Sequence, residues 1–145
     1  MKILIYGGKG WIGQQFCKLV NQTDHQLYLG TARANNKTDI IKEIKKINPT
    51  HLVSFIGRTH GTHNNKYYST IDYLEQPGKL QENIRDNLYS PIQLALLAKK
   101  HNIHYTYLGT GCIFKYDDEH LFGKEVNGFN EQSEPNLSSD DEWSG

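Results

Sequence analysis

The chain has 145 residues, of which 37% are hydrophobic and 22% charged, so it is long enough to bury a core but short for two full domains. Basic residues outnumber acidic ones by fourteen to seven over residues 1–114, whereas residues 115–145 hold two basic and nine acidic residues. Because no apolar run reaches the roughly 20 residues of a membrane span, and no basic stripe is interleaved with aromatics, we expect neither a membrane nor a nucleic-acid partner.

Short apolar runs alternate with amphipathic segments along the first hundred residues. The apolar runs predict strands at residues 2–6, 26–29, 51–56 and 104–108. The amphipathic segments predict a helix at residues 11–21, a second helix capped by Thr38 and stopped at Asn48-Pro49, and a long third helix with a kink at Pro91. Residues 58–78 have no clear period. Strands that alternate with helices predict an α/β fold, a Rossmann-like doubly wound parallel sheet.

The long third helix is predicted from one apolar stripe. Its members recur at helical spacing. They are Leu80, Ile84, Leu88, Ile92, Ala95 and Leu96. Beyond Phe114 the chain becomes polar and acidic, so we expect residues 115–145 to be mostly loop.

A glycine-rich turn joins the first predicted strand to the first predicted helix. Gly7, Gly10 and Gly13 are spaced as G-x-x-G-x-x-G. In a turn of this kind the first glycine permits the tight bend, the second lets the backbone approach a pyrophosphate, and the third packs the helix on the strand. The backbone amides of Trp11 and Ile12 are then expected to face phosphate. The alternative is a turn that binds no ligand, but the flanking strand and helix favour a dinucleotide cofactor.

The residues after the second and third strands refine this expectation. Sites specific for NAD carry an acidic residue after the second strand, whereas this chain carries Arg33, followed by Lys37, which points to NADP(H). The alternative for Arg33 is a solvated surface charge. Ligands of parallel sheets bind outside the carboxyl ends of the strands, so Phe55, Ile56 and Gly57 are expected to lie against the cofactor. Residues 1–114 are thus predicted to form an NAD(P)-binding Rossmann domain.

Several of these features together resemble the extended short-chain dehydrogenase/reductases that act on nucleotide-4-keto-6-deoxysugars. They are the glycine spacing, Arg33, Asn87, the run Leu-Gly-Thr-Gly-Cys-Ile-Phe at residues 108–114, Tyr116-Asp117, His120 and Glu134-Pro-Asn136. The later part is most similar to the plant UDP-4-keto-6-deoxyglucose 3,5-epimerase/4-reductases of UDP-rhamnose synthesis. GDP-fucose synthase and dTDP-4-dehydrorhamnose reductase are similar more distantly. The resemblance extends from residue 1 to about Ser138, which is about half of such an enzyme.

The resemblance implies NADPH-dependent epimerisation and reduction of a nucleotide sugar, with UDP-4-keto-6-deoxyglucose as the favoured substrate. Thr110 matches the family residue whose hydroxyl hydrogen-bonds the 4-keto oxygen, and Cys112 matches the cysteine that exchanges protons beside the ketone. Asn87 matches the helix asparagine that supports the site. The alternative for Thr110 is a threonine at the end of a strand, and the alternative for Cys112 is a small buried thiol. For Cys17 we expect a small buried thiol.

One family element is absent from the sequence. Reductases of this kind protonate the product through a tyrosine with a lysine four residues later, but none of the nine tyrosines here has that lysine. We therefore expect the chain alone to be inactive, either as part of a longer enzyme or, alternatively, as a non-catalytic NADP-binding regulatory remnant. The incomplete sheet would expose an edge, which favours a homodimer.

Cysteine and histidine usage suggests no further chemistry. Cys17 and Cys112 are far apart and no signal peptide is evident, so we expect free thiols and a cytoplasmic protein. His60-x-x-His63 and His101-x-x-His104 have no cysteine or carboxylate at a familiar metal spacing. We therefore expect no metal site.

Overall fold

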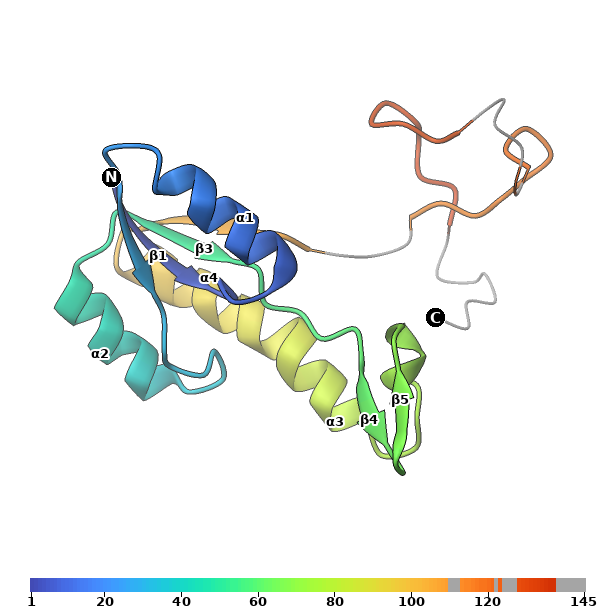
Figure 1. Cartoon of the computed structure of the whole chain (residues 1–145), viewed down its shortest axis with the longest axis horizontal. Helices are drawn as coiled ribbons and strands as arrows, with labels where there is room; N and C mark the ends of the chain where they lie inside the picture. Colours follow the sequence, from blue (N-terminus) through green and yellow to red (C-terminus); the bar gives the residue numbers. More distant parts are fainter. Residues whose placement is uncertain (110–112, 122, 124–127, 138–145) are drawn as a thin grey trace. The chain divides into compact units, whose positions relative to one another are not determined.

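The computed structural model describes residues 1–109, 113–121, 123 and 128–137. The chain divides into two compact units, residues 1–109 and residues 110–145. In the first unit a four-stranded parallel sheet has helices on both faces (Figure 1). The predicted Rossmann-like doubly wound fold is therefore confirmed. None of the helices within the described residues is long and apolar enough to cross a membrane.

The parallel sheet has the order β2-β1-β3-β6. Its strands are β1 (Lys2–Tyr6), β2 (Gln26–Leu29), β3 (His51–Ser54) and β6 (His104–Tyr107). The third strand ends two residues before the predicted position. Phe55 still donates a backbone hydrogen bond to Tyr6, but the next amide, of Ile56, donates to the hydroxyl of Ser54 at 3.3 Å and so leaves the ladder.

Two apolar layers enclose the sheet because successive side chains of a strand point to opposite faces. Ile3, Ile5 and Val53 pack toward α1 (Trp11–Val20). Leu4 and Leu52 belong to the larger cluster that includes residues of α2 (Lys37–Ile47) and α4 (Ser90–Lys100). Figure 1 shows α1 on one side of the sheet and α2 and α4 on the other.

The second helix begins earlier than its predicted cap. The cap is Asn36, whose side chain accepts a hydrogen bond from the amide of Asp39 at 3.2 Å, so the expected cap Thr38 is wrong. Asparagine is the stronger capping residue because its short side chain reaches the free amides of the first turn. The helix ends as predicted, at Asn48, which adopts a left-handed φ of 49° before Pro49.

A short hairpin lies in the region where the sequence suggested no element. Strands β4 (Gly61–His63) and β5 (Lys66–Tyr68) pair antiparallel, followed by the 3₁₀ turn η1 (Ile71–Tyr73). Asn64 and Asn65 join the strands with φ of 48° and 61°. Asparagine tolerates this left-handed conformation, so the Asn-Asn pair was the available signal for the hairpin.

The long helix is divided at an irregular turn. It consists of α3 (Leu80–Asn83), the π-helical turn η2 (Ile84–Tyr89) and α4. The backbone amide of Ser90 donates to the carbonyl of Arg85, five residues back, and its hydroxyl donates to the same oxygen at 2.7 Å. Pro91 has no amide proton, so it cannot continue the regular hydrogen-bond pattern of the helix. The irregular turn lies just before Pro91, the residue at which the sequence predicts a kink.

The apolar stripe that predicted this helix is not the face that packs on the sheet. Leu80, Ile84, Leu88, Ile92 and Leu96 are each 47–67% exposed. The buried residues of α4 are Ser90, Pro91, Gln93, Leu94, Leu97 and Ala98. The most regular pattern in the segment therefore marks an exposed face.

Candidate functional site

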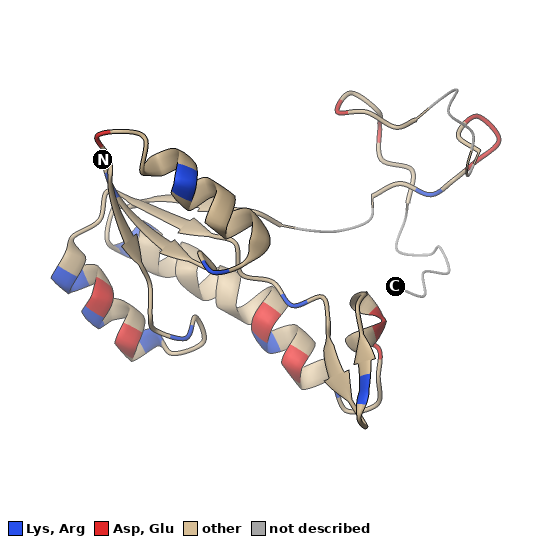
Figure 2. Cartoon of the chain, in the orientation of Figure 1, with Lys and Arg blue, Asp and Glu red and all other residues tan. Residues whose placement is uncertain are grey.

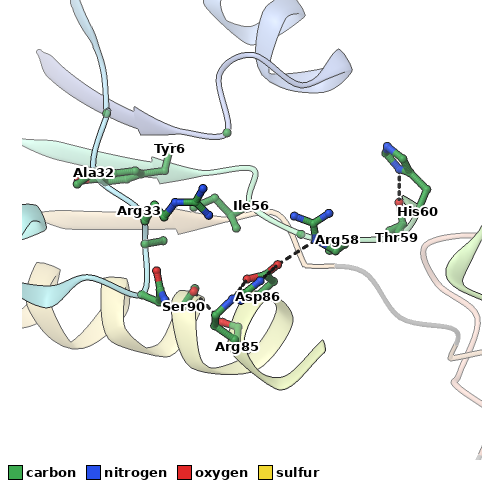
Figure 3. Close-up of a pocket in the computed structure, with 15 residues that line it drawn as sticks. Tyr6, Ala32, Arg33, Ile56, Arg58, Thr59, His60, Arg85, Asp86 and Ser90 are labelled. Carbon is green, nitrogen blue, oxygen red and sulfur yellow. Dashed lines mark hydrogen bonds and ion pairs between the residues drawn. The ribbon is translucent and has the colours of Figure 1, made fainter. Parts of the chain in front are cut away.

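A cleft of about 420 Å³ opens at the carboxyl ends of three parallel strands (Figure 3). Gly7 follows β1, Gly30 follows β2, and Ile56 and Gly57 follow β3, and all four line the cleft. The sheet order reverses between β1 and β3, because the chain places β2 on one side of β1 and β3 on the other. Open parallel sheets bind ligands in the crevice at such a switch point.

The glycine turn has the tight geometry that its sequence predicts. Gly7 has φ of +80°, and a Cβ at Gly13 would lie 2.3 Å from the carbonyl oxygen of Gly7. Gly10, the cap of α1, carries no side chain, and Trp11 and Ile12 are 80% and 44% exposed, so the helix start is accessible. Gly7 lines the cleft, whereas Gly10, Trp11, Ile12 and Gly13 do not.

Arg33 extends into the cleft from the loop between β2 and α2 (Figure 3). Ala32 and Ala34, on either side of it, also line the cleft. Among the described residues, no carboxylate forms an ion pair with Arg33. The guanidinium is therefore available to an anionic ligand. Lys37 lies outside the cleft, beside an apolar groove on α4.

The carboxylate of Glu43, on α2, holds the start of this loop. Its Oε1 accepts hydrogen bonds from the Thr31 amide at 2.7 Å, the Thr31 hydroxyl at 2.6 Å and the Ala32 amide at 2.9 Å. Its Oε2 accepts from the buried Tyr6 hydroxyl at 2.7 Å. Burial alone would raise the pKa of Glu43, but the bonds from Thr31, Tyr6 and Ala32 outweigh it and hold the pKa below its ordinary value. Sequence reasoning missed this residue.

The lowered pKa of Glu43 predicts an acid-sensitive contribution to stability. A carboxyl group whose pKa is lower in the folded state stabilises the fold fully above its ordinary pKa of 4.5, and this stability is lost as pH falls through the lower folded value. Glu43→Gln should therefore lower the free energy of unfolding at pH 7, and its difference from the wild type should narrow below pH 4.5. Urea unfolding of both chains at pH 7 and at about pH 3.5 measures this. A difference that stays constant with pH would contradict it.

Charged residues at the far side of the cleft form a connected network. Arg58 Nε lies 2.9 Å from carboxylate oxygens of both Glu82 and Asp86, and Arg85 makes two bonds to Asp86, at 2.6 and 2.9 Å. The hydrogen bond from Arg85 is the main reason that the pKa of Asp86 lies below its ordinary value. Figure 2 shows acidic and basic residues interspersed along this α3–η2 segment. The two arginines are thus neutralised, in contrast to Arg33.

Asn87 acts on the backbone at the end of β3 and does not line the cleft. Its Oδ1 accepts from the Arg58 amide at 2.7 Å, and its Nδ2 donates to the Arg58 carbonyl at 3.0 Å. The side chain therefore holds the segment that follows Gly57. Phe55, also predicted to contact cofactor, turns to the opposite face and packs against Phe16 with ring centroids 5.3 Å apart.

The two predicted catalytic residues, Thr110 and Cys112, lie outside the described residues. The residues that follow them form a small polar cluster within the second unit. The side chain of Asn136 bonds both backbone groups of Lys115, at 2.8 and 3.0 Å, and donates to Asp117 at 2.8 Å. His120 Nδ1 lies 2.7 Å from Asp117 Oδ1. Sequence positions quoted for the family resemblance are thus in mutual contact.

Histidines elsewhere form no three-residue metal set within the described ranges. His104 begins β6, as expected, and its ring lies 5.2 Å from that of His51 on β3. His60 lines the cleft and bonds the Thr59 hydroxyl at 3.2 Å.

Comparison with known proteins identifies relatives of the chain. No protein-family model matches it. It is 49% identical over 137 residues to protein L780 of Acanthamoeba polyphaga mimivirus, and the crystal structure of the L780 UDP-rhamnose synthase superposes with a TM-score of 0.76 over 95% of the chain. It is 32% identical over 138 residues to a trifunctional dehydratase/epimerase/reductase of Arabidopsis thaliana. The chain is related to the UDP-rhamnose synthases and epimerase/reductases. The resemblance stated from the sequence is confirmed.

The relationship to the rhamnose epimerase/reductases covers only part of those proteins. The chain spans 45% of the viral protein and 19% of the Arabidopsis protein. The structure of a dTDP-4-dehydrorhamnose reductase from Bacillus anthracis, solved with NADP, superposes with a TM-score of 0.65 at 16% sequence identity, and the match covers 39% of that chain. This similarity supports the fold alone.

Proposed function

We infer that this chain is the cofactor-binding part of an NADPH-dependent 3,5-epimerase/4-reductase of a nucleotide-4-keto-6-deoxysugar, with UDP-4-keto-6-deoxyglucose as the favoured substrate. The observation that carries the proposal is Arg33, an arginine without an ion-pair partner among the described residues, in a cleft at the switch point of a parallel sheet. The identities to rhamnose-synthesising relatives support the reaction class.

The residues present fit a dinucleotide phosphate. The turn at Gly7 and the close approach at Gly13 bring the start of α1 next to the end of β1, which is the arrangement that receives a pyrophosphate. Arg33 offers a guanidinium where an NAD-specific site offers a carboxylate, and guanidinium groups bind phosphate by paired hydrogen bonds. NADPH, when bound, supplies the hydride for reduction of the ketone.

The reacting groups of this chain follow β6 in the sequence. Thr110 and Cys112 come three and five residues after Tyr107, the last residue of β6. We propose that the Thr110 hydroxyl donates a hydrogen bond to the 4-keto oxygen and polarises it. The Cys112 thiolate would remove a proton from the carbon next to the ketone, where the ketone stabilises the carbanion as an enolate, and a second acid would deliver a proton to the opposite face of that carbon. Both roles rest on the family resemblance.

Arg33→Ala is the direct test of the cofactor assignment. Because Arg33 is expected to contact only the phosphate that distinguishes NADPH from NADH, its loss should weaken NADPH binding by about tenfold, equivalent to ~1.4 kcal/mol, and leave NADH binding nearly unchanged. Titration of the folded chain with each cofactor, followed by nicotinamide fluorescence, measures both affinities.

The control for this titration is Lys18→Ala, which removes an exposed positive charge from α1, outside the cleft. It should bind both cofactors like the wild type. A folded wild-type chain that binds neither cofactor would refute the assignment. NADPH binding without turnover of a nucleotide-4-keto-6-deoxysugar would agree with a cofactor-binding part that needs the tyrosine and lysine missing from this sequence.

A further inference from the structure

We propose that Glu43 and Gln93 are positioning residues that set the preference for the 2′-phosphate, the phosphate that distinguishes NADPH from NADH. They would do so by fixing the backbone on both sides of Arg33. The proposal rests on the proposed function of Arg33. Neither residue belongs to the glycine turn, and neither lines the cleft. Each acts through the loop that carries Arg33.

Glu43 fixes the residues before Arg33. Four donors converge on its carboxylate from Tyr6, Thr31 and Ala32. Tyr6 is 2% exposed, and its ring packs so closely under Gly30 that a Cβ there would lie 2.5 Å from a ring carbon. The loop entrance is therefore held both by hydrogen bonds and by an aromatic ring of the core.

Gln93 fixes the residue after Arg33. Its Nε2 donates to the carbonyl of Ala34 at 2.7 Å, and its Oε1 accepts from the hydroxyl of Tyr89 at 2.8 Å. Gln93 is 6% exposed, so this amide is a buried polar group that needs partners. Glu43 lies on α2 and Gln93 on α4, so two separate helices hold the loop.

Together these contacts leave Arg33 as an exposed side chain on a backbone that is held on both sides. The amide of Ala32 and the carbonyl of Ala34 are both held, and the carbonyl of Arg33 accepts from the amide of Asn36 at 2.8 Å. Binding then orders only the side chain, because the backbone has been ordered on folding. Loss of either anchor would weaken the contact with the 2′-phosphate selectively.

Electrostatics alone predict the opposite sign for Glu43. A carboxylate near an anion site repels a phosphate, so removal of its charge would strengthen binding. Two amides and two hydroxyls, however, donate to this carboxylate. If these bonds position Arg33, the substitution should weaken phosphate binding. The direction of the effect of Glu43→Gln therefore distinguishes a positioning role from a charge effect.

The experiment compares 2′,5′-ADP with 5′-AMP as calorimetric ligands of the full chain. Glu43→Gln and Gln93→Leu should each weaken 2′,5′-ADP about tenfold and change 5′-AMP less than about twofold. A general loss of structure would weaken both ligands together. Matched controls are Glu75→Gln and Gln22→Leu, which alter exposed residues outside the cleft and should leave both affinities unchanged.

Three results would overturn the proposal: unchanged affinities for both ligands in both variants, an equal loss of affinity for both ligands, or tighter 2′,5′-ADP binding by Glu43→Gln. If Glu43→Gln does not fold, Thr31→Val removes one of the four donors and should weaken 2′,5′-ADP about threefold. Arg33→Ala separates the proposed cofactor assignment from the proposed anchoring role of Glu43 and Gln93. If it leaves the ratio of the two affinities unchanged, the cofactor assignment fails; if it alone changes the ratio, only the anchoring role fails.

Discussion

Gly13→Ala is expected to destabilise the chain by about 1–3 kcal/mol and to abolish NADPH binding. The added Cβ would lie 2.3 Å from the Gly7 carbonyl oxygen and 2.8 Å from the Gly8 Cα. Both are backbone atoms, so no side-chain rotation relieves the overlap and α1 must move away from the turn. Alanine gains up to about 1 kcal/mol over glycine in helix propensity, which only partly offsets this cost. Urea unfolding and NADPH titration measure the two effects.

Gly128→Ala is the control for Gly13→Ala. A Cβ at Gly128 meets no atom within 4 Å, so the substitution should change the free energy of unfolding by no more than about 0.5 kcal/mol. If Gly13→Ala is as well tolerated as this control and still binds NADPH, the close approach of helix and turn is not required for the site.

The fold followed from the sequence where local pattern and tertiary packing agree. The strand at Lys2–Tyr6 is apolar and buried after Lys2 because the sheet is covered on both faces, and the predicted bounds match. The hairpin at residues 61–68 was missed because three-residue strands are too short to show a period. The cap at Asn36 was missed because Thr38 is also a good capping residue, and only the structure decides between neighbours.

The candidate site followed from the sequence only where a motif is local. Gly7 and Arg33 could be found because their positions relative to the strands define them. Glu43 and Gln93 lie ten and sixty residues after Arg33, and no spacing rule connects them to it. Arg58 and its carboxylate partners are likewise joined by the approach of a loop and a helix that are 24 or more residues apart. Such contacts arise from packing, which a sequence pattern does not encode.

Leu94→Ala and Leu96→Ala are expected to differ sharply although they lie two residues apart in α4. Leu94 is fully buried in the larger core cluster, so its truncation should cost about 2–5 kcal/mol, a large part of the stability of a small domain. Leu96 is 63% exposed, so its truncation should change the free energy of unfolding by no more than about 0.5 kcal/mol. The two substitutions gain the same helix propensity, so their difference in urea unfolding isolates burial. A comparable loss at Leu96, increasing with protein concentration, would mean that a second copy covers the exposed stripe in solution.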